Sequence, residues 1–175
     1  IFEKFNLAKK YGFDINMDFI AGLPEEDFFD FKNSIDTAIN LSPENITVHT
    51  LCLKKGSLLK EETDRLDGGL VPKMVEYAHE VLQKSGYNPY YLYRQKYTAG
   101  NLENTGYAKK GKECKYNIGI MEEISSNVAS GAHSISKKVY NGGERIERYA
   151  SPKDILTFIN KVDEIIEKKR ELFQK

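Results

Sequence analysis

The sequence has almost no cysteine and no excess of charge of either sign. Its two cysteines, Cys52 and Cys114, are too far apart for a disulfide framework or a metal-ligand motif, and we expect two reduced thiols. The 26 basic residues balance 26 acidic ones, so the chain has no general attraction for nucleic acid or for an anionic membrane. No apolar run is long enough to cross a bilayer. These absences favour a cytoplasmic protein that binds neither nucleic acid nor membrane.

Strand patterns and helix patterns alternate in the first half of the chain. The sequence opens without an initiator methionine, inside an amphipathic helix that ends near Gly12, and we therefore expect a piece of a longer protein. Strands are predicted at residues 15–21, 46–51 and 88–93, and further helices at residues 26–40 and 71–82. This alternation predicts parallel βαβ units, either on one side of an α/β barrel or in an open sheet.

The pattern changes after Tyr93. Residues 94–113 have no sustained period and predict a long loop. Strand-like pieces follow at residues 116–121, 127–131, 134–140 and 145–149, and the turn Asn141-Gly142-Gly143 predicts a hairpin within a small antiparallel meander. A final helix is predicted with Ser151 as its N-cap and Pro152 as its first residue. We therefore divide the chain into βα units at residues 1–93 and a C-terminal extension at residues 94–175.

Asp18 is the most informative single residue. In the segment Asn16-Met17-Asp18-Phe19, the polar side chains fall on one face of the predicted strand and the apolar ones on the other. A carboxylate in a strand that reads as buried must be hydrogen-bonded by the protein or must bind a ligand at the carboxyl end of the strand. The alternatives are that Asp18 caps the next helix or pairs with a basic neighbour.

Three segments, in this order, resemble the oxygen-independent coproporphyrinogen III oxidases, which are radical S-adenosylmethionine enzymes. These segments are residues 15–24, residues 103–117 and residues 130–134. The stretch Tyr-Leu-Tyr-Arg-Gln-Lys at residues 91–96 is similar to the divergent Gram-positive coproporphyrinogen dehydrogenase branch. The chain departs from the more frequent family residues at Gly106-Tyr107-Ala108, Lys109-Lys110 and Tyr116. The identity of the substrate is therefore the weakest inference from the resemblance.

The resemblance implies an α/β fold: the C-terminal half of a partial (β/α)6 TIM-like barrel, with a small antiparallel β extension and a final helix. The full-length protein would hold a four-iron four-sulfur cluster and S-adenosylmethionine, and would draw electrons from a reductant protein. It would convert two propionates of coproporphyrinogen III, a tetrapyrrole, into vinyl groups. The three cluster-binding cysteines of the family are absent here, so we expect this chain alone to be inactive. The alternatives are a haem-binding trafficking relative and an unrelated α/β domain.

The same resemblance implies roles for three cofactor-binding residues. Asp18 matches the family's strand acid, which contacts S-adenosylmethionine and could accept its two ribose hydroxyls. Leu51 and Cys52 match the position where backbone groups meet the adenine. No residue of this chain is predicted to bind a metal.

Candidates for substrate binding are less specific. His49 is expected to face the barrel interior, and Arg94 either pairs with a substrate carboxylate or is a surface residue. His133 is a haem or acid–base candidate or a packed structural histidine, and several tyrosines could line a tetrapyrrole pocket or pack within strands: Tyr87, Tyr90, Tyr91, Tyr93 and Tyr97. An exposed sheet edge predicts that the isolated chain self-associates.

Overall fold

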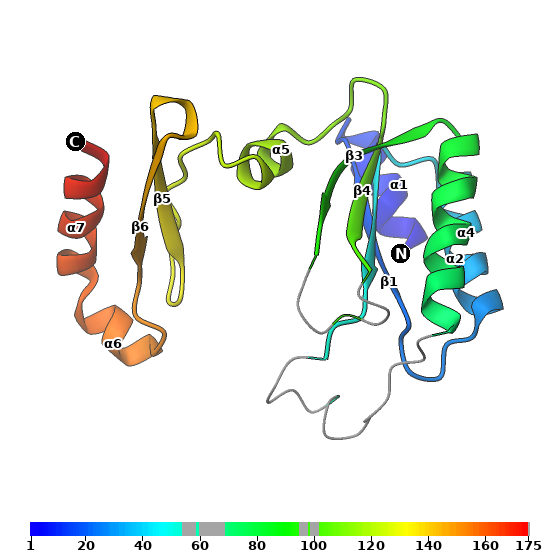
Figure 1. Cartoon of the computed structure of the whole chain (residues 1–175), viewed down its shortest axis with the longest axis horizontal. Coiled ribbons are helices and arrows are strands. Elements are labelled where there is room, and N and C mark those ends of the chain that lie inside the picture. The colour runs from blue at the N-terminus through cyan, green and yellow to red at the C-terminus, as the bar shows by residue number, and fades with distance from the viewer. Residues whose placement is uncertain (54–58, 60–68, 95–97, 99–101, 175) are drawn as a thin grey trace. The chain divides into compact units, whose positions relative to one another are not determined.

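The computed structural model describes residues 1–53, 59, 69–94, 98 and 102–174 (Figure 1). Its residue contacts divide the chain into two compact units, Ile1–Ile118 and Gly119–Lys175. This boundary lies later than the predicted division after residue 93. The assignment of residues 94–175 to a substrate-side extension stays a prediction.

A four-stranded sheet forms the centre of the first unit. Its strands are β1 (Asn16–Ala21), β2 (Asn45–Thr50), β3 (Tyr87–Tyr93) and β4 (Asn104–Lys109), in the spatial order β1-β2-β4-β3. β1 and β2 pair in parallel, whereas β4 is antiparallel to both of its neighbours. β3 therefore runs in the predicted direction, with an unpredicted strand between it and β2.

The prediction of a loop over residues 94–113 was wrong where β4 forms. The sequence Asn-Thr-Gly-Tyr-Ala-Lys has little intrinsic preference for a strand, because Asn, Gly, Ala and Lys are all depleted in strands. Backbone pairing on both sides supplies what local preference lacks: Ala108 lies opposite Asn45, and Leu92 opposite Thr105. Tertiary context thus decides the conformation of this segment.

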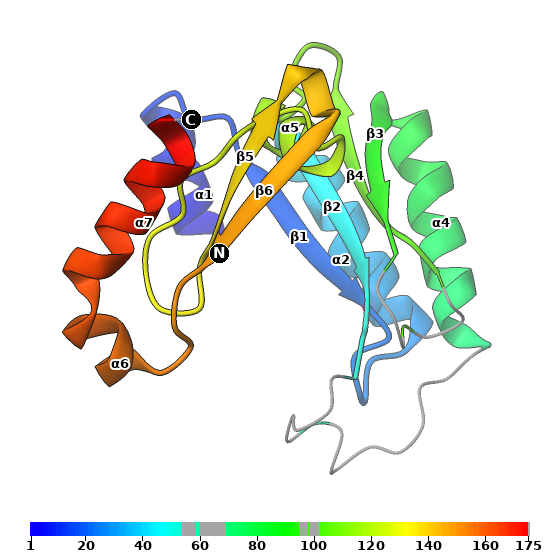
Figure 2. The same cartoon turned by 60° about the vertical axis from the view of Figure 1, so that its left-hand side comes forward.

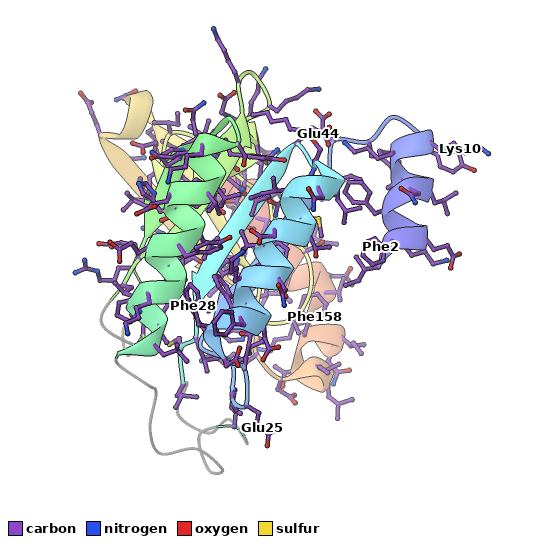
Figure 3. All side chains as sticks on the ribbon, turned by 90° about the vertical axis from the view of Figure 1, so that its right-hand side faces the viewer. Phe2, Lys10, Glu25, Phe28, Glu44 and Phe158 are labelled. Carbon is purple, nitrogen blue, oxygen red and sulfur yellow. The ribbon has the colours of Figure 1, made fainter. Side chains whose placement is uncertain are left out.

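Two long helices cover one face of the sheet (Figure 3). They are α2 (Phe28–Leu41) and α4 (Leu70–Lys84), and a shorter helix, α1 (Phe2–Lys10), precedes β1. Asp27 caps α2 by accepting hydrogen bonds from the backbone N–H groups of Phe29 and Asp30, which places the start of the helix near the predicted position. The helices bury apolar side chains against those of β1, β2 and β4: Ala21, Phe31, Ile35, Ala38, Ile46, Val48, Val71, Met74, Ala78, Leu82 and Tyr107.

The opposite face of the sheet corrects the interpretation of β1 as a buried strand. Met17 and Phe19 pack toward the helices, but the described residues of this unit leave Asn16, Asp18 and Ile20 exposed. The side chain of Asp18 is 59% exposed. Asp18 therefore carries no burial cost in this chain, and its position rather than its desolvation is the reason to consider it.

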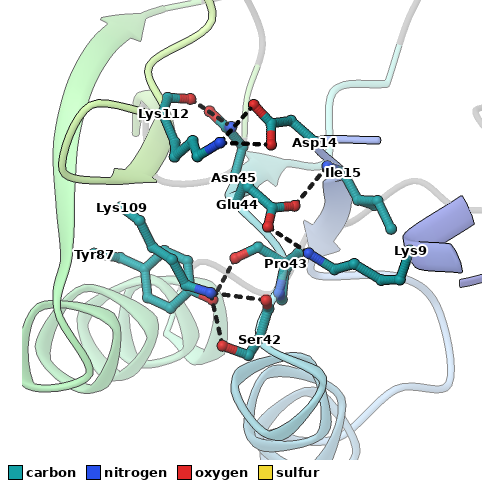
Figure 4. Close-up of polar contacts among 10 residues, drawn as sticks. All are labelled: Lys9, Asp14, Ile15, Ser42, Pro43, Glu44, Asn45, Tyr87, Lys109 and Lys112. Carbon is teal, nitrogen blue, oxygen red and sulfur yellow. Dashed lines mark hydrogen bonds and ion pairs between the residues drawn. The ribbon is translucent and has the colours of Figure 1, made fainter. Parts of the chain in front are cut away.

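Ion pairs and hydrogen bonds link the amino ends of β1 and β2 to α1 and to the segment after β4 (Figure 4). Glu44 pairs with Lys9 and accepts a hydrogen bond of 2.8 Å from the backbone N–H of Ile15. Burial alone would raise the pKa of Glu44, but these two partners outweigh it and hold the pKa below its usual value. Lys112 pairs with Asp14 at 2.9 Å. This end of the sheet is a structural anchor.

The second unit contains the predicted hairpin. β5 (Ile135–Tyr140) and β6 (Arg145–Ala150) pair antiparallel around the short 3-10 turn η2 (Asn141–Gly143), as Figure 2 shows. The predicted strand at 127–131 is reduced to a single bridge between Asn127 and Lys137. The predicted strand at 116–121 is instead a helix, α5 (Lys115–Met121), at the boundary between the units. In a segment as short as this, the spacing of the apolar residues does not distinguish a helix from a strand.

The C-terminal helix begins later than predicted and is divided in two. Its parts are α6 (Ile155–Asn160) and α7 (Val162–Gln174). Asp154, rather than Ser151, is the N-cap, and its carboxylate accepts a hydrogen bond of 2.8 Å from the N–H of Thr157. None of the helices in the described part of the chain is both long and apolar enough to cross a membrane. The cytoplasmic location stays a prediction.

Candidate functional site

A pocket of about 450 Å³ lies toward the carboxyl ends of β1 and β2. Ligands in α/β folds bind at this end of parallel strands, beyond which the connecting loops begin. Four of the six predicted site residues, namely Asp18, His49, Leu51 and Cys52, line this one pocket. Its other lining residues are Ile20, Thr50, Tyr93 and Asn104.

The Asp18 carboxylate projects from β1 and has two neighbours on the same face. Its Oδ1 accepts a hydrogen bond of 2.8 Å from Asn16 Nδ2 and lies 3.5 Å from His49 Nε2. The predicted alternative of a helix cap is wrong, because the next helix is capped by Asp27. The other alternative was a basic neighbour, and His49 lies in that place. Since the Asp18 side chain is more than half exposed, its carboxylate can accept further hydrogen bonds from a ligand.

Further contacts connect His49 back to Asn16 through two tyrosines. The Tyr93 hydroxyl lies 3.4 Å from His49 Nδ1, and its ring stacks on that of Tyr91 with an interplanar angle of 8°. The Tyr91 hydroxyl lies 3.4 Å from Thr47 Oγ1, which donates to Asn16 Oδ1 at 3.1 Å. We call the resulting closed set of side chains the Asp18 circuit: Asn16, Asp18, Thr47, His49, Tyr91 and Tyr93.

Electrostatics within the Asp18 circuit favour neutral tyrosines. Burial raises the pKa of Tyr91, and the negative charge of Asp18 raises it further. Burial likewise raises the pKa of Tyr93, with smaller contributions from Tyr91 and Asp18. Both hydroxyls therefore keep their protons at neutral pH and can donate hydrogen bonds.

A glycine in β4 allows the Asp18 circuit to close. Tyr91 belongs to β3 and Thr47 to β2, and β4 lies between those two strands. The Tyr91 ring crosses β4 over Gly106, where a Cβ atom would lie 1.9 Å from Tyr91 Cε1. Sequence reasoning identified Gly106 only as a departure from the family pattern and did not predict this role.

Asn104 is a pocket residue that sequence reasoning missed, because it lies in the segment predicted as a loop. It is 1% exposed, and its Oδ1 accepts a hydrogen bond of 2.7 Å from the backbone N–H of Thr50. Its buried Nδ2 has no hydrogen-bond partner among the described residues. A buried unpaired amide is unusual in a folded protein. Through its bond to Thr50, Asn104 ties β4 to the carboxyl end of β2 at the pocket.

Leu51 and Cys52 lie where predicted, just after β2. The backbone N–H of Leu51 donates to the carbonyl oxygen of Ala21 at 3.0 Å, so this N–H is not available to a ligand. Cys52 forms an isolated bridge with Thr98. The Cys52 side chain is a half-buried thiol that is not in a disulfide and lines the pocket.

The two remaining candidates lie elsewhere. Arg94 forms an ion pair with Glu103, and its side chain is 50% exposed. It is not among the residues that line the pocket. His133 belongs to the second unit, where it is exposed and its backbone N–H donates to the Pro152 carbonyl at 2.8 Å. The roles of both residues in substrate binding stay predictions.

The described residues do not gather a metal-ligand set. Within the described ranges, no group of three or more His, Cys, Asp or Glu side chains could hold a metal ion. Cys52 and Cys114 are not joined in a disulfide, and they are far apart along the chain.

Comparison with solved structures identifies the class of fold. Coproporphyrinogen III oxidase (HemN) from Escherichia coli, a radical SAM enzyme, matches 93% of this chain and 37% of its own, with a TM-score of 0.61 and 17% identity. The chain thus has the fold of part of a radical S-adenosylmethionine barrel enzyme, which confirms the predicted α/β class. No family model matches the chain.

Sequence comparison defines the family. The chain is 38% identical over 181 aligned residues to the oxygen-independent coproporphyrinogen-III oxidase-like protein HemZ of Bacillus subtilis, a match to 99% of this chain and 36% of that protein. It is 27% identical over 150 residues to the heme chaperone HemW of Haemophilus influenzae, which covers 85% and 36% of the two chains. The chain is therefore homologous to the oxygen-independent coproporphyrinogen-III oxidase-like proteins, as the motifs predicted. It spans about a third of the length of these relatives.

Proposed function

We propose that this chain is the C-terminal part of a radical S-adenosylmethionine enzyme that oxidatively decarboxylates the propionates of coproporphyrinogen III in haem biosynthesis. The observation that carries the proposal is the convergence of Asp18, His49, Leu51 and Cys52 on one pocket at the carboxyl ends of β1 and β2. The homology to HemZ over nearly the whole chain and the shared fold with HemN support it.

In this proposal, the pocket binds S-adenosylmethionine. The Asp18 carboxylate accepts hydrogen bonds from the ribose hydroxyls, and the backbone beside Leu51 and Cys52 borders the adenine. The bound cofactor supplies the radical that removes a hydrogen atom from the substrate. The residues of this chain orient the nucleoside and exclude water from one side of it, and the cluster ligands come from a preceding part of the protein.

A haem-carrying function is the second candidate, and the match to the heme chaperone HemW favours it. His133 would then be a candidate haem ligand, since its side chain is exposed. Both candidates take a tetrapyrrole as the small-molecule partner. They differ in whether the carboxylates of that partner are removed.

An activity assay separates the two functions. The full-length protein, with its cluster reconstituted under anaerobic conditions, is supplied with reductant, S-adenosylmethionine and coproporphyrinogen III. We expect protoporphyrinogen and 5′-deoxyadenosine to form. Cofactor cleavage without decarboxylation, together with tight haem binding, would instead support the haem-carrying function.

A binding assay tests the role of Asp18. Asp18→Ala removes an ionised acceptor, so we expect the affinity for S-adenosylmethionine to fall at least about tenfold. The absorbance of the cluster should be unchanged. Asp14→Ala is the matched control, because Asp14 is also an exposed acid but pairs with Lys112 at the anchored end of the sheet. Equal affinity in the Asp18→Ala variant and the wild type would refute the assignment of this pocket to the cofactor.

The DNA sequence gives a further test. Under this proposal, the codons upstream of Ile1 encode a Cys-x-x-x-Cys-x-x-Cys segment. An open reading frame without that segment would remove the radical mechanism.

A further inference from the structure

We infer that Asn16 and His49 are positioning residues that fix the Asp18 carboxylate for its ligand. The inference rests on the proposed function only in taking that ligand to be S-adenosylmethionine. Both residues reach the same atom: Asn16 Nδ2 lies 2.8 Å and His49 Nε2 lies 3.5 Å from Asp18 Oδ1. The hydrogen bond from Asn16 and the contact with the His49 ring at Oδ1 hold the plane of the carboxylate and leave Oδ2 for the ligand.

The orientation of the Asn16 amide is determined by its other contact. Its Oδ1 accepts a hydrogen bond from Thr47 Oγ1 at 3.1 Å. The amide oxygen therefore faces β2, and the amide nitrogen faces Asp18, which can only accept while it is ionised. A flipped amide would lose both hydrogen bonds. Thr47 is 1% exposed, so this support for Asn16 comes from a residue that packing holds in place.

The place of the His49 ring is set by contacts at both of its nitrogens. Nε2 lies 3.5 Å from Asp18 Oδ1, and Nδ1 lies 3.4 Å from the Tyr93 hydroxyl. The titratable groups that line the pocket with His49 are Asp18 from β1, Tyr93 from β3 and Cys52 after β2. His49 is thus held between Asp18 and Tyr93, and its ring borders Asp18 Oδ1 from the side of β2.

The experiment compares two replacements of His49 in the full-length holoprotein. Gln carries an amide nitrogen near the place of Nε2 and keeps a polar group beside Asp18, whereas Leu keeps only bulk. The dissociation constant for S-adenosylmethionine is measured by equilibrium dialysis. We expect His49→Leu to weaken binding about three- to tenfold, the scale of one polar contact, and His49→Gln to stay within about twofold of the wild type.

Rescue by Gln and a double variant distinguish positioning from a general structural effect. His49→Gln should keep the affinity that His49→Leu loses, and His49→Leu should have no further effect in an Asp18→Ala background. If Gln behaves like Leu, or if the two effects add, the inference is wrong while the role of Asp18 stands. If Asp18→Ala alone leaves the affinity unchanged, the proposed function fails first.

Discussion

Replacing Gly106 with Ala tests whether the Tyr91 ring crosses β4 as the structure places it. The new Cβ would lie 1.9 Å from Tyr91 Cε1 and 2.5 Å from Cδ1, so the ring must leave its position. Gly106 does not have a positive φ, so alanine fits the backbone there, and the change removes flexibility from the unfolded chain. Overpacking costs about 1–3 kcal/mol. The lost flexibility returns about 0.4–1 kcal/mol.

We therefore expect a net destabilisation of about 1–2 kcal/mol for Gly106→Ala, measured by urea unfolding of the full-length protein. The same substitution in a Tyr91→Ala background should be neutral or slightly stabilising, because no ring is left to displace. The effect on the unfolded chain is common to both backgrounds and cancels, so the double-mutant cycle gives a coupling energy of about 1–3 kcal/mol between positions 91 and 106.

Tyr91→Phe is the matched control. It keeps the ring over Gly106 and removes only the hydroxyl that lies 3.4 Å from Thr47 Oγ1. Gly106→Ala should therefore cost as much in this background as in the wild type. Additive effects of Gly106→Ala and Tyr91→Ala would show that the ring does not occupy this place, and the Asp18 circuit would lose its connection across β4.

Three further predictions concern the anchored end of the sheet, the C-terminal helix and the edges of the sheet. Because Lys9 and the N–H of Ile15 lower the pKa of folded Glu44, its stabilising effect is present above the unfolded pKa of about 4.3 and is lost as the pH falls through the folded value. Glu44→Gln should therefore lower stability at pH 7 and flatten its decline in acid; an unchanged acid profile would contradict this. Asp154→Ala should lower the free energy of unfolding by about 1 kcal/mol and reduce the helical circular dichroism signal. If Ser151→Ala caused the same loss, Ser151 would be the N-cap and this assignment would be wrong. Since β1 and β3 are the sheet edges, the isolated chain should dimerise or aggregate in sedimentation experiments, and a clean monomer at high concentration would refute that.

Elements with a strong period were predictable from the sequence. The apolar stripes of α2 and α4 and the turn before β6 gave those elements their approximate positions. β4 was not predictable, because Asn104 and Gly106 weaken any strand pattern and the pairing partners lie far away in the sequence. The start of the last helix depends on whether the side chain of Asp154 or that of Ser151 accepts the capping hydrogen bond, and both are good N-cap residues.

The candidate site shows the same limit. Strand alternation correctly placed Asn16 and Asp18 on one face of β1, since that inference needs only a period of two. The unpaired amide of Asn104 and the passage of Tyr91 over Gly106 depend on which strand lies between β2 and β3. No local pattern carries that information.

The place of β4 in the sheet also bears on the order in which the protein becomes complete. Asn45 of β2 pairs with Ala108 of β4, so one edge of β2 stays without this partner until the segment between them has been synthesised. Asn104 joins the pocket wall only when that pairing forms. A ligand that binds the pocket therefore stabilises the last strand of this sheet to be synthesised, and ligand occupancy and docking of β4 are thermodynamically linked. During synthesis, a bound ligand would then favour closure of the sheet that holds it.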